Sequence, residues 1–354
     1  MNIDLSEIRK ICEEAINGRV LTQNEIEKLI ACPDEHADVI FDAADKIRAA
    51  EVGEQVHLRG LIEFSNICKK NCSYCGIRKS NNNIMRYRME IDEIIETAKN
   101  AEKLGYRSVV LQSGEDSYFT ADRLAFLVRA IKADTDLAIT LSVGEYSYED
   151  YKIMREAGAD RFLLRFETAD RELYKALHPD SDFDERIQCL HALRDLGFQV
   201  GSGFMAGLPG ETPEIAAKNI MLLRELDLDM VGIGPFLPSP DTPLKDEKGG
   251  TLMAALKAVA LARLVLRNAH IPATTAMGTI DPQGRQKALK AGANVVMPNV
   301  TPLKYRDMYL LYPNKICTGD DASHCRNCMG GIIRSIGRTV ASDHGHSLKS
   351  RSSN

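Results

Sequence analysis

Three closely spaced cysteines are the residues of this sequence that are best suited to chemistry. Cys68, Cys72 and Cys75 stand in the segment SNICKKNCSYCGIRK with the spacing Cys-x3-Cys-x2-Cys. Thiolates at such a spacing can bind a four-iron cluster, for which ordinary ferredoxin-type sites use four cysteines. With three thiolates, one iron keeps an open coordination position. The loop therefore predicts a [4Fe–4S] cluster with one iron free to bind a small molecule.

The open iron position suits the amino and carboxylate groups of S-adenosylmethionine (SAM), which would place its sulfonium beside the cluster. One electron then breaks a C–S bond and yields methionine and a 5′-deoxyadenosyl radical. Tyr74, just before the third cysteine, can pack near the adenine. The competing interpretation is a zinc site, but zinc usually binds four N or S ligands. No fourth Cys or His lies in the loop, and the next His downstream is His178.

Other residues could hold SAM. Four consecutive residues offer carbonyls and a carboxylate to its ammonium group, with a glycine that allows close backbone approach: Gln112, Ser113, Gly114 and Glu115. Glu167 could accept hydrogen bonds from the ribose hydroxyls. Arg186 could bind the SAM carboxylate through two hydrogen bonds. The alternative for Arg186, in the segment SDFDERIQ, is a surface salt bridge.

The hydrophobic pattern predicts the scaffold that positions these residues. Residues 1 to about 50 are expected to be helical, with a capping box at Thr22 and Glu25. Strands are predicted over residues 56–65, 107–114, 137–144, 160–167, 198–207, 229–236, 271–277 and 293–299. Helices are predicted over residues 91–104, 121–133, 148–157, 183–196, 213–226, 252–268 and 285–290. This alternation predicts an α/β fold, a complete (βα)8 barrel of the TIM type with an N-terminal helical extension.

Residues with useful chemistry follow the C-terminal ends of these predicted strands, where β/α barrels carry their active sites. The set contains Glu63 and the cysteine loop, residues 112–115, Ser142, Glu145, Arg165, Glu167, Met205, Pro235, Thr274, Thr275, Met297 and Asn299. Polar residues also mark the places where strands stop. The whole set therefore supports an active site better than any single member does.

An internal cavity for an anionic substrate is a further prediction. Its expected lining is Arg161, Arg165, Thr274, Thr275, Tyr309 and Tyr312. Residues two apart in a strand face the same side, so Arg165 should face inward together with Glu167. A buried guanidinium needs a partner, and we assign Arg165 a catalytic role in binding the substrate anion. Alternatively, Arg161 and Arg165 pair with barrel carboxylates such as Glu63 and Glu145.

A second group of cysteines lies after the last predicted strand. Cys317, Cys325 and Cys328 have ligand-like spacing, and further donors stand nearby: Asp320, Asp321 and His324. This group predicts a metal site that is peripheral and dispensable for SAM cleavage. The isolated cysteines are expected to be small buried apolar residues: Cys12, Cys32 and Cys189.

Bulk composition narrows the function classes. The chain has 354 residues, 44% of them hydrophobic, which suffices for one large domain. The net charge of −5, without a basic run, argues against binding to nucleic acid or membrane. There is no apolar segment near the ~18 residues of a membrane span, and the acidic N-terminus does not resemble a signal peptide. We expect a cytoplasmic protein, in which the nine cysteines are thiols or metal ligands.

Several segments together closely resemble the HydE family, the radical SAM maturases of [FeFe]-hydrogenase. They are HLRGLIEFSNICKKNCSYCGIR, VVLQSGED, ADRFLLRFETAD, MAGLPGET, DMVGIGPFLPSPDTPL, IPATTAMGT and YPNKIC. The resemblance runs from about Gln55 to Gly330. It implies a complete barrel around a long cavity and work with two partner maturases on the two-iron part (the diiron subcluster of the H-cluster) of the hydrogenase active site. It also implies an organometallic substrate, a cysteine-bound iron carbonyl cyanide unit, and an electron donor such as ferredoxin or flavodoxin.

The resemblance also implies roles for individual residues. The cluster ligands would be Cys68, Cys72 and Cys75, the SAM contacts Ser142, Glu167 and Arg186, and the ligands of a second [2Fe–2S] or [4Fe–4S] cluster Cys317, Cys325 and Cys328. One position departs from the family, which commonly has His where this chain has Phe166. A phenyl ring cannot hydrogen-bond or titrate near SAM as an imidazole could.

Other functions share the barrel. A methylornithine synthase-like lysine mutase would need a pocket for an α-amino acid. A biotin synthase would carry a second cluster inside the barrel, whereas the second cysteine group here looks peripheral. A scaffold that holds an iron–sulfur fragment without turnover is a different class, which the SAM-binding set argues against. We expect three parts: an N-terminal extension (1–54), the barrel (55–300), and a C-terminal extension with the second site and a flexible tail (301–354).

Overall fold

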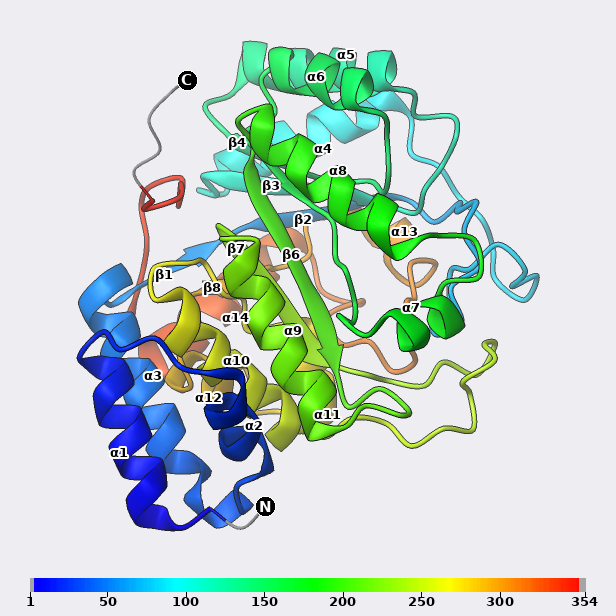
Figure 1. The fold of residues 1–354 in the computed structure, drawn as a ribbon. Helices are drawn as coiled ribbons and strands as arrows, with labels where there is room; N and C mark the ends of the chain where they lie inside the picture. The colour runs from blue at the N-terminus through cyan, green and yellow to red at the C-terminus, as the bar shows by residue number, and fades with distance from the viewer. Residues whose placement is uncertain (1–2, 350–354) are drawn as a thin grey trace.

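The computed structural model describes residues 3–349, in which strands occupy the middle of the molecule and helices surround them (Figure 1). The strands are β1 (Gln55–Leu58), β2 (Gly60–Ser65), β3 (Ser108–Ser113), β4 (Ala138–Ser142), β5 (Arg161–Leu163), β6 (Gln199–Ala206), β7 (Met230–Pro235), β8 (Val295–Val296) and β9 (Thr339–Val340). The helices are α1 (Leu5–Ile16), α2 (Gln23–Ala31), α3 (Ala37–Val52), α4 (Ile91–Lys103), α5 (Ala121–Asp134), α6 (Tyr148–Glu156), α7 (Arg171–Leu177), α8 (Phe183–Asp195), α9 (Pro213–Glu225), α10 (Leu252–Leu266), α11 (Thr275–Ile280), α12 (Gly284–Lys290), α13 (Leu303–Arg306) and α14 (Ala322–Ser335), with a short 3₁₀ helix at Asp34–His36.

The outer helices form where apolar residues recur with helical spacing behind a clear N-cap. In α5, Leu124, Val128 and Ile131 are fully buried on one face. The Thr120 side chain accepts a hydrogen bond from the Arg123 N–H and so caps the first turn. The helices predicted over residues 91–104, 121–133, 148–157, 183–196 and 213–226 are confirmed to within one or two residues.

The N-terminal helices α1–α3 lie beside α10, at one end of the strands (Figure 1). The predicted capping box is confirmed, because the Thr22 hydroxyl accepts from the Glu25 N–H and the Glu25 carboxylate accepts from the Thr22 N–H. Helix α10 is apolar around most of its circumference, as expected of a helix covered on several sides. It contacts α3 and α9 on the outside and β7 on the inside.

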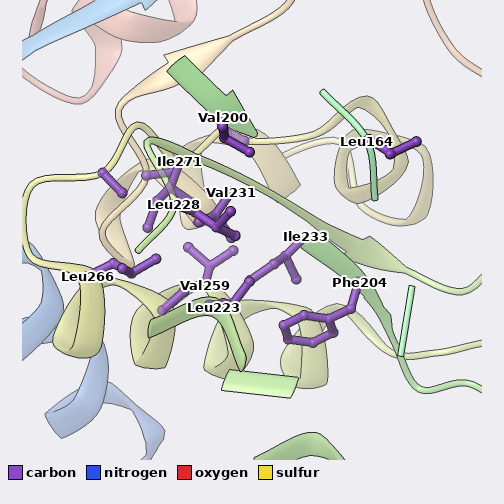
Figure 2. Close-up of a cluster of buried hydrophobic side chains, with 14 of the residues drawn as sticks. Leu164, Val200, Phe204, Leu223, Leu228, Val231, Ile233, Val259, Leu266 and Ile271 are labelled. Carbon is purple, nitrogen blue, oxygen red and sulfur yellow. The ribbon is translucent and has the colours of Figure 1, made fainter. Parts of the chain in front are cut away.

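The core between the sheet and these helices is continuous. Figure 2 shows Phe204 from β6 and Val231 and Ile233 from β7 facing Leu223 of α9 and Val259 of α10. All five side chains are at most 1% exposed. This layer fixes the two strands whose C-terminal ends lead toward the candidate site.

The strands pair in parallel, and the predicted α/β class is confirmed. β2 to β7 form one six-stranded sheet in sequential order, and β8, β1 and β9 form a second sheet. The complete barrel is confirmed only in part, because these strands do not make one continuous ring. Among residues 3–349, isolated parallel bridges connect the two sheets: Leu61 with Asn299, Met230 with His270, and Pro272 with Val295.

Three strand predictions need correction. The strand predicted over 56–65 is broken at Arg59, where pairing changes from β8 and β9 to β3. The strand predicted over 271–277 gives way to α11, for which Thr274 is the N-cap residue. The last predicted strand, 293–299, contains only Val295 and Val296 as strand residues. These short elements are formed by tertiary pairing, which local periodicity does not encode.

The C-terminal segment follows the strand ends opposite the candidate site. The His57 imidazole lies 2.9 Å from the Asp343 carboxylate, and the Ser347 hydroxyl contacts Asp229. The remainder of the predicted flexible tail, residues 350–354, lies outside the described residues. Within residues 3–349, no helix combines the length and apolarity needed to cross a membrane.

Candidate functional site

An internal cavity of about 370 Å³ runs between the strands and opens toward the cysteine loop. Most of the predicted site residues line it. They are Cys68, Cys72, Tyr74, Cys75, Gln112, Ser113, Gly114, Glu115, Ser142, Arg165, Glu167, Arg186, Thr274, Thr275, Tyr309 and Tyr312. Residues from the ends of separate strands thus meet in one space, as expected for parallel strands with a common direction.

The cysteine loop follows β2 and is held by close backbone packing. A Cβ at Gly114 would lie 2.4 Å from the Ile67 carbonyl oxygen, so only glycine fits there without a shift. The Glu115 N–H points at the Cys68 Sγ at 3.4 Å. The Lys69 N–H donates to the backbone carbonyl oxygen of Glu115 at 2.9 Å. The loop after β3 therefore sets the position of the first cysteine.

Arg86, which the sequence reasoning missed, braces the same loop from within. Its guanidinium donates to the carbonyl oxygens of Asn66, Ile77, Arg78 and Asn81 at 2.6–3.0 Å. One planar group with five donors thus ties four backbone carbonyls together. The only sequence signal was an arginine shortly after the motif, in the segment MRYRME.

The three thiols fit a cluster better than a single ion. Burial raises the pKa of Cys68, raises the pKa of Cys72 to about 12, and raises the pKa of Cys75 further. Thiolates there need positive charge, which bound iron supplies. In the described chain, no three Cys, His, Asp or Glu side chains converge closely enough to hold one metal ion. The ligands of a cluster bind separate irons and need not converge on one point.

Glu167 and Arg165 face the cavity together, as the alternation predicted. Glu167 has a φ of 65°, a left-handed conformation that is uncommon for a residue with a side chain and often found at functional sites. Its Oε2 lies 2.8 Å from the Arg165 Nη2 but without hydrogen-bonding geometry, so both atoms can still bond to a ligand. Burial raises the pKa of the Glu167 carboxyl.

Arg186 is buried rather than on the surface, so the surface salt-bridge alternative is wrong. Its Nε donates to the Glu145 carboxylate at 2.6 Å and its Nη1 to the Arg165 carbonyl oxygen at 2.6 Å. Lys70 of the cysteine loop binds the other Glu145 oxygen at 2.8 Å. Burial opposes ionisation of Glu145, but Arg186 and Lys70 outweigh it and lower the pKa of that carboxyl. The Arg186 side chain lines the cavity beside Glu167.

Tyr74 packs into a small apolar cluster with Leu177 and Met205. Its hydroxyl lies 3.0 Å from the His178 Nε2, and the two rings meet edge to face. Burial lowers the pKa of His178 to about 3, so this imidazole is neutral. The pair fixes the aromatic ring next to the third cysteine.

Phe166 is not part of the cavity lining. It is fully buried and stacks on Phe204 with ring centroids 6.1 Å apart. Its neighbours Arg165 and Glu167 line the cavity while Phe166 packs into the core. The departure from the family therefore changes a packing position of this chain.

One wall of the cavity carries a buried ion pair that the sequence did not reveal. Lys315 contacts the Glu63 carboxylate, whose other oxygen accepts from the Asn299 side chain at 2.9 Å. Neither Arg161 nor Arg165, the arginines considered as partners of Glu63, contacts it. Arg165 does pair with another barrel carboxylate, Glu167, at 2.8 Å, whereas Arg161 pairs with none in the described chain. Lys315 lies well beyond β8, in the segment before α14, so no local pattern could place it against β2.

Arg161 also needs correction, because it does not line the cavity. It is fully buried, and its guanidinium bonds to Ser108, Gln199 and backbone oxygens of the C-terminal segment. Arg161 is the first residue of β5, at the opposite end from the site. Arg59, in the middle of a buried stretch of sequence, lines the cavity instead.

The tail cysteines gather around a separate small cavity. Cys317, Cys325 and Cys328 line it together with Asp320. The Arg285 Nη1 lies 3.6 Å from the Cys317 Sγ, and the Arg306 Nη1 lies 3.6 Å from the Cys325 Sγ. Other predicted donors are less available. Asp321 caps α14 by accepting from the His324 N–H, and the His324 side chain is 64% exposed.

Comparison with known proteins agrees with this arrangement. The family model of the Radical SAM superfamily matches residues 62–223. The chain is 47% identical over 333 residues to the [FeFe] hydrogenase maturase subunit HydE of Thermotoga maritima, covering 94% of this chain and 95% of that one. It is 33% identical to the 3-methylornithine synthase of Methanosarcina barkeri, with 84% and 85% covered.

Two solved structures share the fold of this chain. The crystal structure of methylornithine synthase (PylB) superposes with a TM-score of 0.84 at 28% identity, covering 94% of this chain and 97% of that one. A structure of HydG, a maturase of the [FeFe]-hydrogenase, shares the fold with a TM-score of 0.81 at 19% identity, covering 95% and 76%. This chain is therefore a HydE-like radical SAM enzyme and belongs to the radical SAM superfamily.

Proposed function

We propose that this chain is a HydE-type maturase that cleaves SAM reductively and acts on a small anionic or organometallic substrate. Its product would contribute to the diiron subcluster of the [FeFe]-hydrogenase active site. One observation carries the proposal: the three cysteines and the cationic Arg165 line the same cavity. The 47% identity to HydE over nearly the whole chain supports the choice of this reaction.

One set of cavity residues would hold the cluster and SAM, and the remaining lining would bind the substrate. Cys68, Cys72 and Cys75 would hold a [4Fe–4S] cluster, which when bound supplies the electron that cleaves SAM to methionine and a 5′-deoxyadenosyl radical. The proposed SAM contacts are Tyr74, Gln112, Ser113, Gly114, Glu115, Ser142, Glu167 and Arg186. Glu167 has an oxygen free to accept from ribose hydroxyls. Arg186 is held in place by Glu145 and would face the SAM carboxylate.

The remaining lining suits an anion. The Arg165 Nε and the Thr274 hydroxyl are buried without a hydrogen-bond partner in the described chain, and both belong to cavity-lining residues, whereas the Arg165 Nη2 lies in an ion pair with Glu167. A buried donor without a partner is costly, so a ligand that accepts from these groups is favoured. Thr275, Tyr309 and Tyr312 would complete this substrate pocket. The proposed role of Arg165 in binding the substrate anion rests on its Nε, which has no hydrogen-bond partner in the described chain.

The architecture around the cavity is part of the proposal. We propose a complete (βα)8 barrel, supported by parallel bridges from β7 to His270, from Pro272 to β8, and from Asn299, after β8, to β2. We retain the division into 1–54, 55–300 and 301–354. A second [2Fe–2S] or [4Fe–4S] cluster on Cys317, Cys325 and Cys328 is supported by their shared cavity. The other two maturases and a ferredoxin or flavodoxin are the proposed partners in the cytoplasm.

A reconstituted maturation reaction tests this function. Apo-hydrogenase, the two other maturases, SAM and reductant are combined with and without this chain, and hydrogen evolution is measured. We expect evolution to depend on this chain and to be lost in the Cys68→Ala variant. Hydrogenase activation that is equal without the chain would reject the maturase function.

The second candidate is a lysine mutase of the methylornithine synthase type, favoured by the TM-score of 0.84 to that enzyme. The substrates separate the two. Incubation with SAM, dithionite and isotope-labelled lysine should yield no methylornithine if the maturase proposal holds. Appearance of labelled methylornithine would replace the maturase proposal with the mutase.

A further inference from the structure

The tail-cysteine cavity and the internal cavity share a wall. Leu61, Thr275, Met297 and Lys315 line both spaces. Lys315 contacts Glu63 of the internal cavity, while Cys317, two residues further, lines the tail cavity. The two cavities are therefore neighbours that meet at these shared side chains.

One buried side chain reaches from a tail cysteine to this wall. Arg285 of α12 is 6% exposed. Its Nη1 points at the Cys317 Sγ at 3.6 Å, and its Nη2 donates to the Thr275 hydroxyl oxygen at 3.2 Å. Because a guanidinium is rigid and planar, a shift of the sulfur moves the donor that holds Thr275.

The direction of this hydrogen bond matters for the cavity. Arginine has donors and no acceptor, so the Thr275 oxygen must accept from Arg285. The Thr275 hydroxyl hydrogen is then left to donate elsewhere, and an anion in the internal cavity is a suitable acceptor. Thr274 already has a hydroxyl without a partner in the described chain. Arg285 thus orients the second of two adjacent hydroxyls as a donor.

The tail loop itself is built to be rigid. Cys317 has a φ of 66°, uncommon for a residue with a side chain. Arg306, 1% exposed, donates to the carbonyl oxygens of Asn299 and Thr301 and to that of Asp320 in the tail loop. Rigid packing of this kind transmits a displacement instead of absorbing it.

From these contacts we infer that metal occupancy of the tail-cysteine site is coupled to the substrate cavity through Arg285, a positioning residue for Thr275. Binding of iron at Cys317 fixes the sulfur against which Arg285 rests, and Arg285 fixes the hydroxyl of Thr275. The tail site would then tune the binding of the anionic substrate without taking part in SAM cleavage. This inference rests on the proposed second metal site and is independent of the maturation reaction.

Hydrogen exchange tests the coupling in a chain that cannot assemble the primary cluster. In the Cys68→Ala, Cys72→Ala, Cys75→Ala background, the tail site is loaded with iron and sulfide, and iron is counted. We expect loading to slow amide exchange in α11 and α12 by roughly fivefold, the effect of one hydrogen bond on a local opening equilibrium. Peptides of α5, remote from the tail site, should not change.

Two variants break the link from opposite sides. Arg285→Gln removes the guanidinium. Thr275→Val removes the hydroxyl that the guanidinium binds and leaves the contact between Arg285 and Cys317 intact. In both variants, iron loading should no longer slow amide exchange. Lys290→Gln, at the exposed last residue of the same helix, is the matched control and should keep the slowing. The inference is overturned if the background chain takes up no iron, if loading does not slow exchange, or if Thr275→Val retains the full slowing. SAM cleavage plays no part in these readouts.

Discussion

The primary cysteine loop and the tail loop present the same elements in different surroundings. Each carries three cysteines, and each is braced by one arginine that binds backbone carbonyls, Arg86 in the first and Arg306 in the second. In the tail, arginines also approach two of the sulfurs. In the primary loop, the donors near the cysteine sulfurs are backbone N–H groups, those of Lys70 and Glu115 at Cys68 and that of Ile77 at Cys75.

The space next to the thiols differs as well. The primary cysteines border a cavity of about 370 Å³, whereas the tail cysteines border one of about 20 Å³. Charged hydrogen bonds to sulfur and close packing suit a site that orients its ligands and leaves no room for a further molecule. Free volume beside the thiols suits a cluster that must bind a second molecule. The spacing of the cysteines alone does not tell a closed metal site from one that binds a second molecule. The residues and the free volume around the thiols do.

The largest expected contrast comes from removing each cysteine set in turn. The variant with Cys68, Cys72 and Cys75 replaced by Ala should lose the four-iron signal and all SAM cleavage. The variant with the tail cysteines replaced by Ala should lose only the additional iron and keep most of the cleavage. Iron content and 5′-deoxyadenosine are measured for both. A folded tail variant that holds its primary cluster but is inactive would break the distinction.

Glycine packing gives the next contrast. Gly114→Ala places a Cβ against Ile67 and should lower the free energy of unfolding by about 1–3 kcal/mol, as overpacking does. Gly331 lies in α14, where an added Cβ would have open space within 4 Å. There, Gly331→Ala should raise stability by about 0.5–1 kcal/mol through helix propensity. Denaturant unfolding measures both, and equal effects would mean that the primary loop is not tightly packed.

Replacing Arg165 should distinguish SAM cleavage from the reaction of the substrate. Arg165→Ala should leave cluster assembly intact and SAM cleavage nearly unchanged. Substrate-dependent maturation should fall by roughly tenfold or more, the value of one charged hydrogen bond. An equal loss of both activities would show that Arg165 serves SAM or the fold, and the anion role would be withdrawn.

Phe166 should have the smallest effect. Phe166→Leu removes the stacking on Phe204, which is worth about 0.5–1.5 kcal/mol, and should lower the melting temperature slightly. SAM cleavage per cluster should stay the same, because the ring does not line the cavity. A marked loss of cleavage at full cluster content would mean that this position acts on SAM after all.

The sequence predicted those parts of the site that depend on parallel strands. Because such strands end at one edge, residues at or after the ends of β2, β3, β4 and β5 were expected to meet. Cys68, Gln112, Ser142 and Glu167 do line one cavity. Helices with clear caps and one apolar face were also placed correctly. Their signals are local and strong.

Other features depend on the path of the chain and could not be predicted. The contact between Lys315 and Glu63 joins residues far apart in sequence, and it forms because the segment after β8 returns to β2. Arg161 was placed in the cavity by side-chain type, but its position at the start of β5 puts it against the C-terminal segment. The two-residue strand β8 forms through pairing with β1 and a bridge to Pro272, so its sequence carried little signal.

Reductive cleavage of SAM tests the central claim most directly. The chain is loaded with iron and sulfide under anaerobic conditions, its cluster content is determined, and SAM is added with or without dithionite. We predict 5′-deoxyadenosine and methionine in equal amounts, formed only with the reductant. A chain with a full four-iron cluster that binds SAM and yields neither product would contradict the account.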